Sequence, residues 1–308
     1  MVQYKEISYL NYGMALSIQN ENMELIVTTD VGPRILFFGE AGGKNLLFND
    51  IQRENRNNSP LLQSVFGDGT IYYFYGGHRV WASPEHDPNS MCPDNEPAEV
   101  IFGEQSVMVR AKPQPVTGFQ LSMEIAPVEG GFKITSGVKN LSEETKTVAA
   151  WGITQLAPGG HMIIPQVTDN TGLLPNRTIS VWAYTDLQDE RVHFGKKYII
   201  ARQDPEIKQP LKFGINNEAG YLVYVNDGQV FIKTFDWENG KIYPDNNVNC
   251  ECYMDGALIE GECLTYKKLL KTGEFSQVSE VWRLKKTDAQ PDFANEASVE
   301  MFLSQLQI

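Results

Sequence analysis

The sequence predicts an all-β fold: a large antiparallel β-supersandwich with few helices, in a single domain that spans residues 1–308. Short runs of β-branched and aromatic residues recur along the chain, and Gly, Asn, Asp and Pro separate them. Helical periodicity is sparse, and the sequence has no internal repeat and no low-complexity tract. Many short strands joined by turns, with few helices, are typical of a large sandwich or barrel.

Several of these runs alternate between apolar and polar residues, which indicates strands with one buried face. Turn residues at 129–131 and 225–229 predict two hairpins, because Gly and Asn-Asp-Gly sequences favour tight reversals. The expected strands are residues 23–28, 34–38, 106–111, 119–125, 132–138, 198–201, 221–225, 230–234 and 278–284.

Two segments depart from the strand pattern. Residues 292–307 carry Val299, Phe302, Leu303 and Leu306 at the three- and four-residue spacing of an amphipathic helix. Residues 49–60 are rich in Asn, Arg and Asp, so we expect an exposed loop or insertion there.

Composition limits the classes of partner. Hydrophobic residues make up 42% of the chain and charged residues 21%, which is enough apolar material for a packed core. The net charge of −13 repels phosphate backbones and anionic membrane surfaces, so neither nucleic acid nor a membrane is an expected partner. The negative net charge does not repel a small neutral carbohydrate, so such a molecule is the expected partner. The oligomeric state stays open.

The ends and the cysteines suggest a cytoplasmic location. The N-terminal residues lack the basic and apolar pattern of a secretory signal. Cys92, Cys250, Cys252 and Cys263 show no zinc spacing, so we expect reduced thiols, with a soft-metal cluster of the last three as a remote alternative. No cofactor is predicted. A metal site stays open, because the oxygen-rich loops at 93–95 and 245–247 would permit calcium.

The segment from Tyr75 to Asn95 combines residue types that suit a sugar site. Aromatic rings stack on the apolar faces of sugars, and carboxylates, guanidinium and amides bind the hydroxyl groups. Gly76 and Gly77 permit a sharp turn or a close approach of the backbone to a ligand. The alternative is a buried tryptophan anchor with a surface salt bridge between Arg79 and Glu85. The candidate residues are His78, Arg79, Trp81, Glu85, Asp94 and Asn95.

A second candidate segment is 149–160, which ends in a Pro-Gly-Gly turn. On a strand, Trp151 and Gln155 lie on the same face, where they suit a sugar-binding surface. The alternative is a tryptophan buried in the sandwich core.

A third candidate region runs from Lys233 to Glu262. Strand alternation places Glu251 with Tyr253 on one face, and Glu260 with Glu262 on one face. Carboxylates in a half-buried cleft can act as general acids or bases. Arg79 and Lys233 would permit a ligand that carries a phosphate or a carboxylate. The alternative for the glutamates is an ordinary solvated strand face.

Taken together, these motifs resemble a bacterial family within the galactose mutarotase-like superfamily. The resemblance extends over residues 7–284 and rests on segments 29–35, 76–85, 93–95, 151–160, 243–247, 251–253 and 260–262, with Asn45. It implies one large antiparallel supersandwich whose concave face binds carbohydrate, as in aldose 1-epimerases.

The resemblance also implies an acid–base mechanism. In aldose 1-epimerases a glutamate takes the proton of the anomeric hydroxyl group while a histidine donates to the ring oxygen. Glu262 is the best match for the glutamate, with Glu260 and Glu251 as alternatives, and His78 is the candidate acid. The strand at 151–155 holds no histidine where the resemblance implies one. This departure argues that the scaffold and cleft are kept, and it argues against the standard mutarotase chemistry.

Three functions are compatible with these motifs. The first is a carbohydrate-binding protein with an epimerase-like cleft that acts as a sugar epimerase or mutarotase. The second is a non-catalytic carbohydrate-binding protein. The third is a structural or accessory protein in which the motif residues hold loops together.

Overall fold

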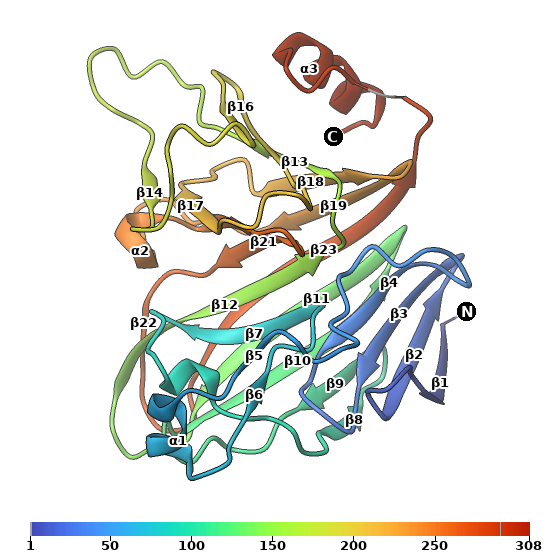
Figure 1. Ribbon diagram of the computed structural model, residues 1–308, viewed down its shortest axis with the longest axis vertical. Helices are drawn as coiled ribbons and strands as arrows, with labels where there is room; N and C mark the ends of the chain where they lie inside the picture. The colour runs from blue at the N-terminus through green and yellow to red at the C-terminus, as the bar shows by residue number, and fades with distance from the viewer. Residues whose placement is uncertain (1, 290) are drawn as a thin grey trace.

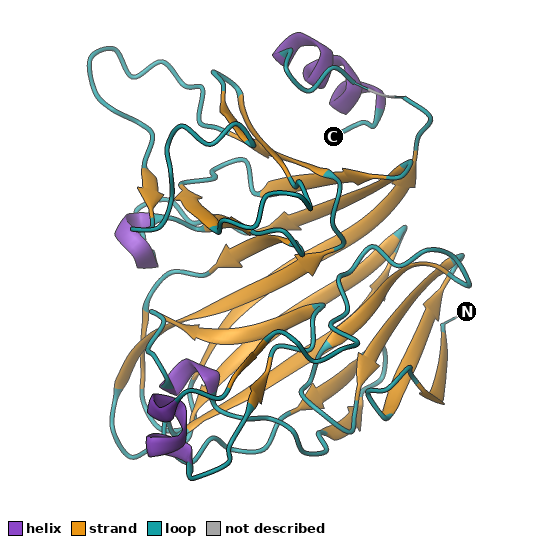
Figure 2. Cartoon of the chain, in the orientation of Figure 1, coloured by secondary structure: helices purple, strands orange, loops and turns teal. Residues whose placement is uncertain are grey.

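The computed structural model describes residues 2–289 and 291–308 and consists mainly of two large antiparallel sheets (Figures 1 and 2). The helices are short and lie at the periphery of the sheets. This architecture confirms the predicted all-β supersandwich.

The first sheet has eleven strands and carries the candidate site. Neighbouring strands along it are β1 (Gln3–Ser8), β2 (Met14–Asn20), β3 (Met23–Thr28), β4 (Ile35–Glu40), β7 (His78–Ser83), β12 (Lys146–Leu156), β21 (Ile259–Leu264), β20 (Cys250–Met254), β17 (Leu211–Ile215) and β14 (Ile179–Val181), and β22 (Lys268–Leu270) pairs with β12.

The second sheet has ten strands. Their order is β15 (Val192–Phe194), β16 (Tyr198–Arg202), β13 (His161–Pro165), β18 (Tyr221–Asn226), β19 (Gln229–Phe235), β23 (Phe275–Lys286), β11 (Gly131–Asn140), β10 (Phe119–Val128), β9 (Val107–Arg110) and β8 (Glu99–Phe102).

The remaining elements are small. A two-stranded ribbon and one helix lie in the segment that covers part of the first sheet. The ribbon consists of β5 (Arg56–Asn57) and β6 (Tyr72–Tyr73), and the helix is α1 (Pro60–Phe66). The other small elements are a 3-10 helix (Asn89–Met91), α2 (Pro244–Asn247) and α3 (Glu296–Gln305).

All nine strands expected from the sequence are present, with ends that differ by a few residues. Both predicted hairpins form, and in the second one Asp227 and Gly228 adopt the positive φ values that such a turn requires. The expected C-terminal helix is α3, which buries Val299, Phe302 and Leu303 against the second sheet (Figure 1). Residues 49–60 form the expected, largely exposed loop, which includes β5 and leads into α1.

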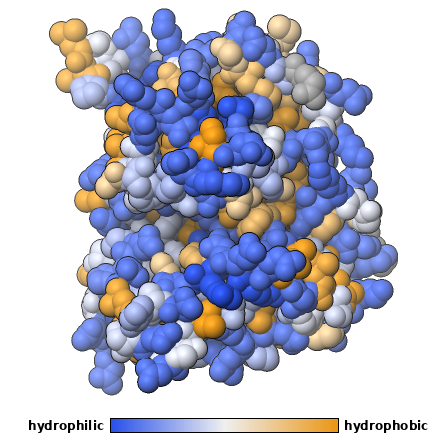
Figure 3. Space-filling model, viewed as in Figure 1, coloured by the Kyte–Doolittle hydropathy of each residue, from blue (hydrophilic) through white to orange (hydrophobic). Residues whose placement is uncertain are grey.

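The main hydrophobic core contains apolar side chains from both sheets, among them Phe38, Phe132 and Trp282. The face of the molecule in Figure 3 is mainly hydrophilic, with apolar side chains in small groups. No helix among the described residues is long and apolar enough to cross a membrane. All four cysteines are free and buried, as expected. No group of three or more His, Cys, Asp or Glu side chains within 2–289 and 291–308 is placed to hold a metal ion.

Glycines allow two close backbone approaches next to β7. A Cβ atom on Gly77 would lie 1.9 Å from the carbonyl oxygen of Ile35, and φ there is +64°. Gly76 has φ +100° and a similar approach to the carbonyl of Phe48. Both glycines thus approach other backbone segments of the protein, and these contacts position the start of β7 beside its neighbours.

A buried polar network joins the two sheets behind the candidate site. The Lys233 ammonium of β19 lies 3.2 Å from the Glu280 carboxylate of β23, and it donates to Thr154 Oγ1 of β12 at 2.8 Å. It also donates to the carbonyl of Gly261 in β21 at 2.9 Å. Since Lys233 and Glu280 are both fully buried, this pair connects the second sheet to two strands that carry site residues.

His78 and Cys263 belong to the same network. The His78 ring nitrogens lie 2.9 Å from Thr154 Oγ1 and 3.1 Å from Ser136 Oγ. Cys263 Sγ lies 2.6 Å from Glu280 Oε1. Gly152 of β12 leaves the space for these groups, because a Cβ atom there would lie 2.4 Å from the Glu280 carboxylate.

Replacing Lys233 with methionine should lower the free energy of unfolding by about 3–5 kcal/mol, because Glu280 would remain as an uncompensated buried charge. Chemical denaturation measures this loss. The matched control is Lys133→Met, an exposed lysine on β11, which should change stability little. Equal effects of the two variants would contradict a special contribution of the buried pair.

Stability should also fall as the pH drops from 6.5 towards 4. Burial lowers the pKa of His78 from 6.5 to about 4. The charge of Glu280 opposes this shift, and the charges of Lys233 and Arg79 add to it. Between pH 6.5 and 4 the unfolded chain therefore binds a proton at His78 that the folded chain does not bind. About 3 kcal/mol of stability that is present above pH 6.5 is lost across this window. The difference in unfolding free energy between wild type and His78→Asn, measured against pH, should shrink over that window. A constant difference would refute this assignment.

Candidate functional site

A cavity of about 320 Å³ lies on the outer face of the first sheet. Six of the residues predicted from the sequence line it, namely Arg79, Trp81, Glu85, Trp151, Gln155 and Glu260. The other lining residues are Asn55, Phe74, Met91, Trp182, Tyr184, Lys212, Tyr253 and Asp255.

Strand register explains how distant residues meet in this cavity. Trp81 of β7 pairs directly with Trp151 of β12, and Gln155 of β12 pairs with Glu260 of β21. Glu260 in turn pairs with Tyr253 of β20. Because paired residues on antiparallel strands point to the same face, the cavity floor follows one row of side chains across the sheet.

Glu260 is the central carboxylate of the cavity. It accepts a hydrogen bond from Gln155 Nε2 at 2.7 Å, and Arg79 Nη2 lies 3.5 Å from the same oxygen. The side chain is only 7% exposed. Burial, with the charge of Glu262 as a smaller cause, raises the pKa of Glu260 to about 7, although Arg79 opposes the shift. Such a group can accept and release a proton near neutral pH.

Glu262 and Glu251 lie beneath the cavity and are fully buried. The Lys212 ammonium of β17 joins them, since it lies 2.9 Å from Glu262 Oε2 and 2.8 Å from Glu251 Oε2. Trp151 Nε1 donates to Glu262 Oε2 at 2.6 Å. Burial raises the pKa of Glu251 well above its usual value. These two glutamates therefore contact Lys212 and Trp151 and do not line the cavity.

Both cations of the site lie against aromatic rings. The Arg79 guanidinium lies 4.5 Å from the centre of the Trp81 ring. The Lys212 ammonium lies 4.5 Å from the Trp151 ring and 4.7 Å from the Trp182 ring. Cation–π contacts of this kind compensate part of the desolvation of a buried charge.

The two predicted stacking residues are largely buried. Trp81 and Trp151 are each 5% exposed and belong to a small apolar cluster with Leu62 of α1. They therefore combine the two roles considered from the sequence, as buried anchors and as walls of the cavity. Tyr184, at 47% exposed, offers the more accessible aromatic surface.

Several buried polar atoms in and beneath the cavity have no hydrogen-bond partner within the described part of the chain. They are Arg79 Nε and Nη1, Gln155 Oε1, Glu251 Oε1 and Glu262 Oε1. An unpaired buried polar group is unfavourable, so such groups favour a hydrogen-bonding molecule close to them.

Besides Glu251 and Glu262, four more predicted site residues do not line the cavity. His78 and Lys233 point into the space between the sheets, because His78 precedes Arg79 on β7 and successive strand residues face opposite sides. His78 is therefore not positioned to act as the acid of this cavity.

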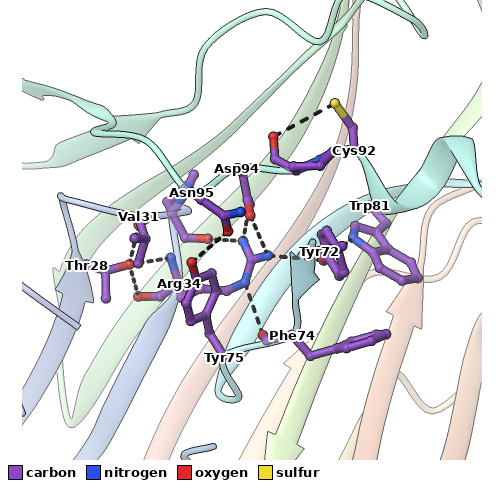
Figure 4. Close-up of polar contacts among 12 residues, drawn as sticks. Thr28, Val31, Arg34, Tyr72, Phe74, Tyr75, Trp81, Cys92, Asp94 and Asn95 are labelled. Atoms are coloured by element: carbon purple, nitrogen blue, oxygen red, sulfur yellow. Dashed lines mark hydrogen bonds and ion pairs between the residues drawn. The ribbon is translucent and has the colours of Figure 1, made fainter. Parts of the chain in front are cut away.

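Asp94 and Asn95 are the other two, and they hold a loop in place (Figure 4). The Asp94 carboxylate pairs with the buried Arg34 guanidinium at 2.6 Å. Asn95 accepts a hydrogen bond from the Tyr75 hydroxyl at 2.7 Å and donates to the carbonyl of Ile71 at 2.9 Å. Their polar atoms contact protein groups, and neither residue lines this cavity, so a role in ligand binding stays a prediction for both.

Sequence reasoning missed Lys212, Trp182 and Tyr184. Lys212 carried a usable signal, because it stands between Leu211 and Phe213 in an apolar run. A charged residue at the buried end of such a strand needs a partner. Trp182 and Tyr184 follow the short strand β14 and had no comparable local signal.

No protein-family profile and no curated protein sequence matches this chain. Solved structures do match, at low sequence identity. A protein from Synechocystis sp. PCC 6803 matches with a TM-score of 0.57 and 10% identity, over 91% of this chain and 99% of that one. A galactose mutarotase-like protein from Lactobacillus casei ATCC 334 matches with a TM-score of 0.56 and 10% identity, over 88% of this chain and 100% of that one.

A galactose mutarotase related enzyme from Lactobacillus acidophilus is also similar, with a TM-score of 0.53 and 11% identity, over 89% of this chain and 99% of that one. At these identities the likeness concerns the fold and not the chemistry. The resemblance inferred from the motifs is thus confirmed for the architecture: this chain has the galactose mutarotase-like β-supersandwich fold.

Proposed function

We propose that this protein binds a small carbohydrate in the cavity on the first sheet, and that Glu260 exchanges a proton with the anomeric hydroxyl group of that sugar. The observation that carries the proposal is the position of Glu260 on the cavity floor, between the Arg79 guanidinium and the Gln155 amide. A carboxylate held between two donors, beside aromatic walls, suits both the hydroxyl rim and the apolar face of a sugar.

The cavity chemistry favours a sugar over an apolar ligand. Unpaired donor and acceptor atoms on Arg79 and Gln155 match the alternating donor and acceptor character of hydroxyl groups. Trp182 and Tyr184 add aromatic surface for the C–H face of the ring. Galactose mutarotase-like proteins among the solved structures share this fold, which supports the same class of ligand.

The proposed reaction interconverts the two anomers. Glu260 takes the proton of the anomeric hydroxyl group while an acid protonates the ring oxygen, and the bond from the ring oxygen to the anomeric carbon breaks. After rotation of the aldehyde, the reverse transfers close the ring on the other face. Glu85, at the cavity, is the candidate acid, because desolvation raises its pKa.

A binding protein without catalysis is the second candidate. The observation that favours it is the absence of histidine among the described residues that line the cavity. Imidazole is the usual donor at neutral pH, so a site without it transfers protons less readily. Anomer exchange separates the two candidates, because only an enzyme accelerates it.

Glu260→Gln should lower kcat/KM for anomer exchange of glucose, galactose or xylose by at least about 100-fold, because glutamine cannot accept the proton. Polarimetry or NMR of freshly dissolved sugar measures the rate. The wild-type rate should also fall below pH 7, where Glu260 becomes protonated. Glu143→Gln, in an exposed turn, is the matched control and should retain the wild-type rate.

An unchanged rate in Glu260→Gln would exclude Glu260 as the base. Sugar binding by the wild type without faster exchange would establish the second candidate. No binding of any of these sugars would reject the proposed ligand class.

Trp182→Ala should weaken sugar binding about five- to tenfold, because the ring loses an aromatic contact worth about 1 kcal/mol. Isothermal titration calorimetry or sugar chemical-shift changes measure the affinity. Trp237→Ala is the matched control, since Trp237 stacks on Tyr243 outside this cavity. Equal losses in both variants would indicate general destabilisation and argue against binding at Trp182.

A further inference from the structure

A second cavity, of about 370 Å³, lies next to the first one. Trp81 lines both cavities. The second cavity is formed by the end of β7 and the adjoining part of β12, and residues of the segment between β9 and β10 complete it. Proximity and a shared tryptophan suggest that the two cavities serve one ligand.

The loop that follows β7 contributes to both cavities. Glu85 and Met91 of this loop line the first cavity. His86 and Asn89, between them in sequence, line the second one. One short segment therefore contributes lining residues to both cavities.

The second cavity contains a buried polar group that lacks a partner. Ser83 is 1% exposed, and its Oγ atom has no hydrogen-bond partner in the described part of the chain. A buried hydroxyl group without a partner favours a ligand that supplies one. Ser83 lies two residues beyond Trp81 on β7, so both side chains point to the same face of the sheet.

The remaining lining combines apolar surface with polar groups. Val116 and Phe119 provide the apolar side, and Lys146 lies 5.2 Å from the Phe119 ring while it donates to the Thr117 carbonyl. None of the described lining residues is Asp or Glu. A second sugar ring, with an apolar face and neutral hydroxyl groups, fits this mixture better than a cation or a purely apolar group does.

We propose that the second cavity binds a neighbouring residue of the same carbohydrate, so that the preferred ligand is an oligosaccharide of at least two residues and not a free monosaccharide. This inference rests on the proposed function of the first cavity. The shared Trp81, the shared loop and the unpaired Ser83 hydroxyl group carry it independently of any role of Glu260 in catalysis.

The test compares the affinities of glucose, galactose and xylose with those of maltose, cellobiose, galactobiose and xylobiose. At least one disaccharide should bind about tenfold or more tightly than its monosaccharide, which corresponds to ~1.4 kcal/mol. Saturation-transfer NMR on that complex should show protein contacts on the protons of both sugar residues. Disaccharides that bind no more tightly, or contacts on one residue alone, would overturn the inference.

Val116→Trp should abolish the disaccharide advantage, because Val116 lines the second cavity and an indole there would fill it. The matched control is Val65→Trp, at an exposed valine of α1 that lines neither cavity, and it should retain the advantage. Ser83→Ala, a smaller change, should reduce the advantage without blocking the space. Thermal unfolding of each variant verifies that it is folded.

The outcomes also separate this inference from the proposed function. Monosaccharide binding without a disaccharide advantage would retain the first cavity as a sugar site and reject the second. An advantage that survives in Val116→Trp would equally reject the second cavity as its cause. Failure of every sugar to bind would reject both proposals together.

Discussion

The alternation of side chains along β7, β12 and β21 is the constraint on which the rest of the structure depends. These strands carry polar residues on both faces, so the middle of the first sheet lies between two polar layers. The inner layer contains Lys233 and Glu280, which contact β12 and β21 from the second sheet. The outer layer contains Lys212 and Glu260. The contacts of each layer hold β7, β12 and β21 in place, and these strands in turn position the side chains of the other layer.

Burying several charges beside one another is unfavourable unless each charge is paired. In the outer layer the charges are not all closely paired. Lys212 is shared by Glu251 and Glu262, and the contact between Glu260 and Arg79 is long, at 3.5 Å. Burial, with the charge of the neighbouring Glu262 as a smaller cause, raises the pKa values of Glu251 and Glu260. Of these two carboxylates, Glu260 is the one that also lines the cavity.

The galactose mutarotase-like fold does not by itself fix the chemistry of this cavity. His78 of β7, the histidine predicted as the acid, points into the space between the two sheets, where burial lowers its pKa to about 4. Within the described lining, a sugar would meet carboxylates, the cations Arg79 and Lys212, amide groups and aromatic rings. Sugar binding in the proposed function depends on these groups, and its acid–base chemistry depends on Glu260.

Sequence alone determined the strands, the hairpins, the fold class and which residues share a strand face, because a two-residue alternation and turn residues are local properties. It thereby placed Trp151 and Gln155 on one face of their strand, and Glu260 and Glu262 on one face of theirs, as the structure has them. Tertiary structure alone decided which face of each strand lines the cavity, and this leaves His78 and Lys233 outside it. It also decided which distant strands become neighbours, and this places Lys212 beside Glu262. Those outcomes depend on long-range pairing and register, and no local pattern encodes them.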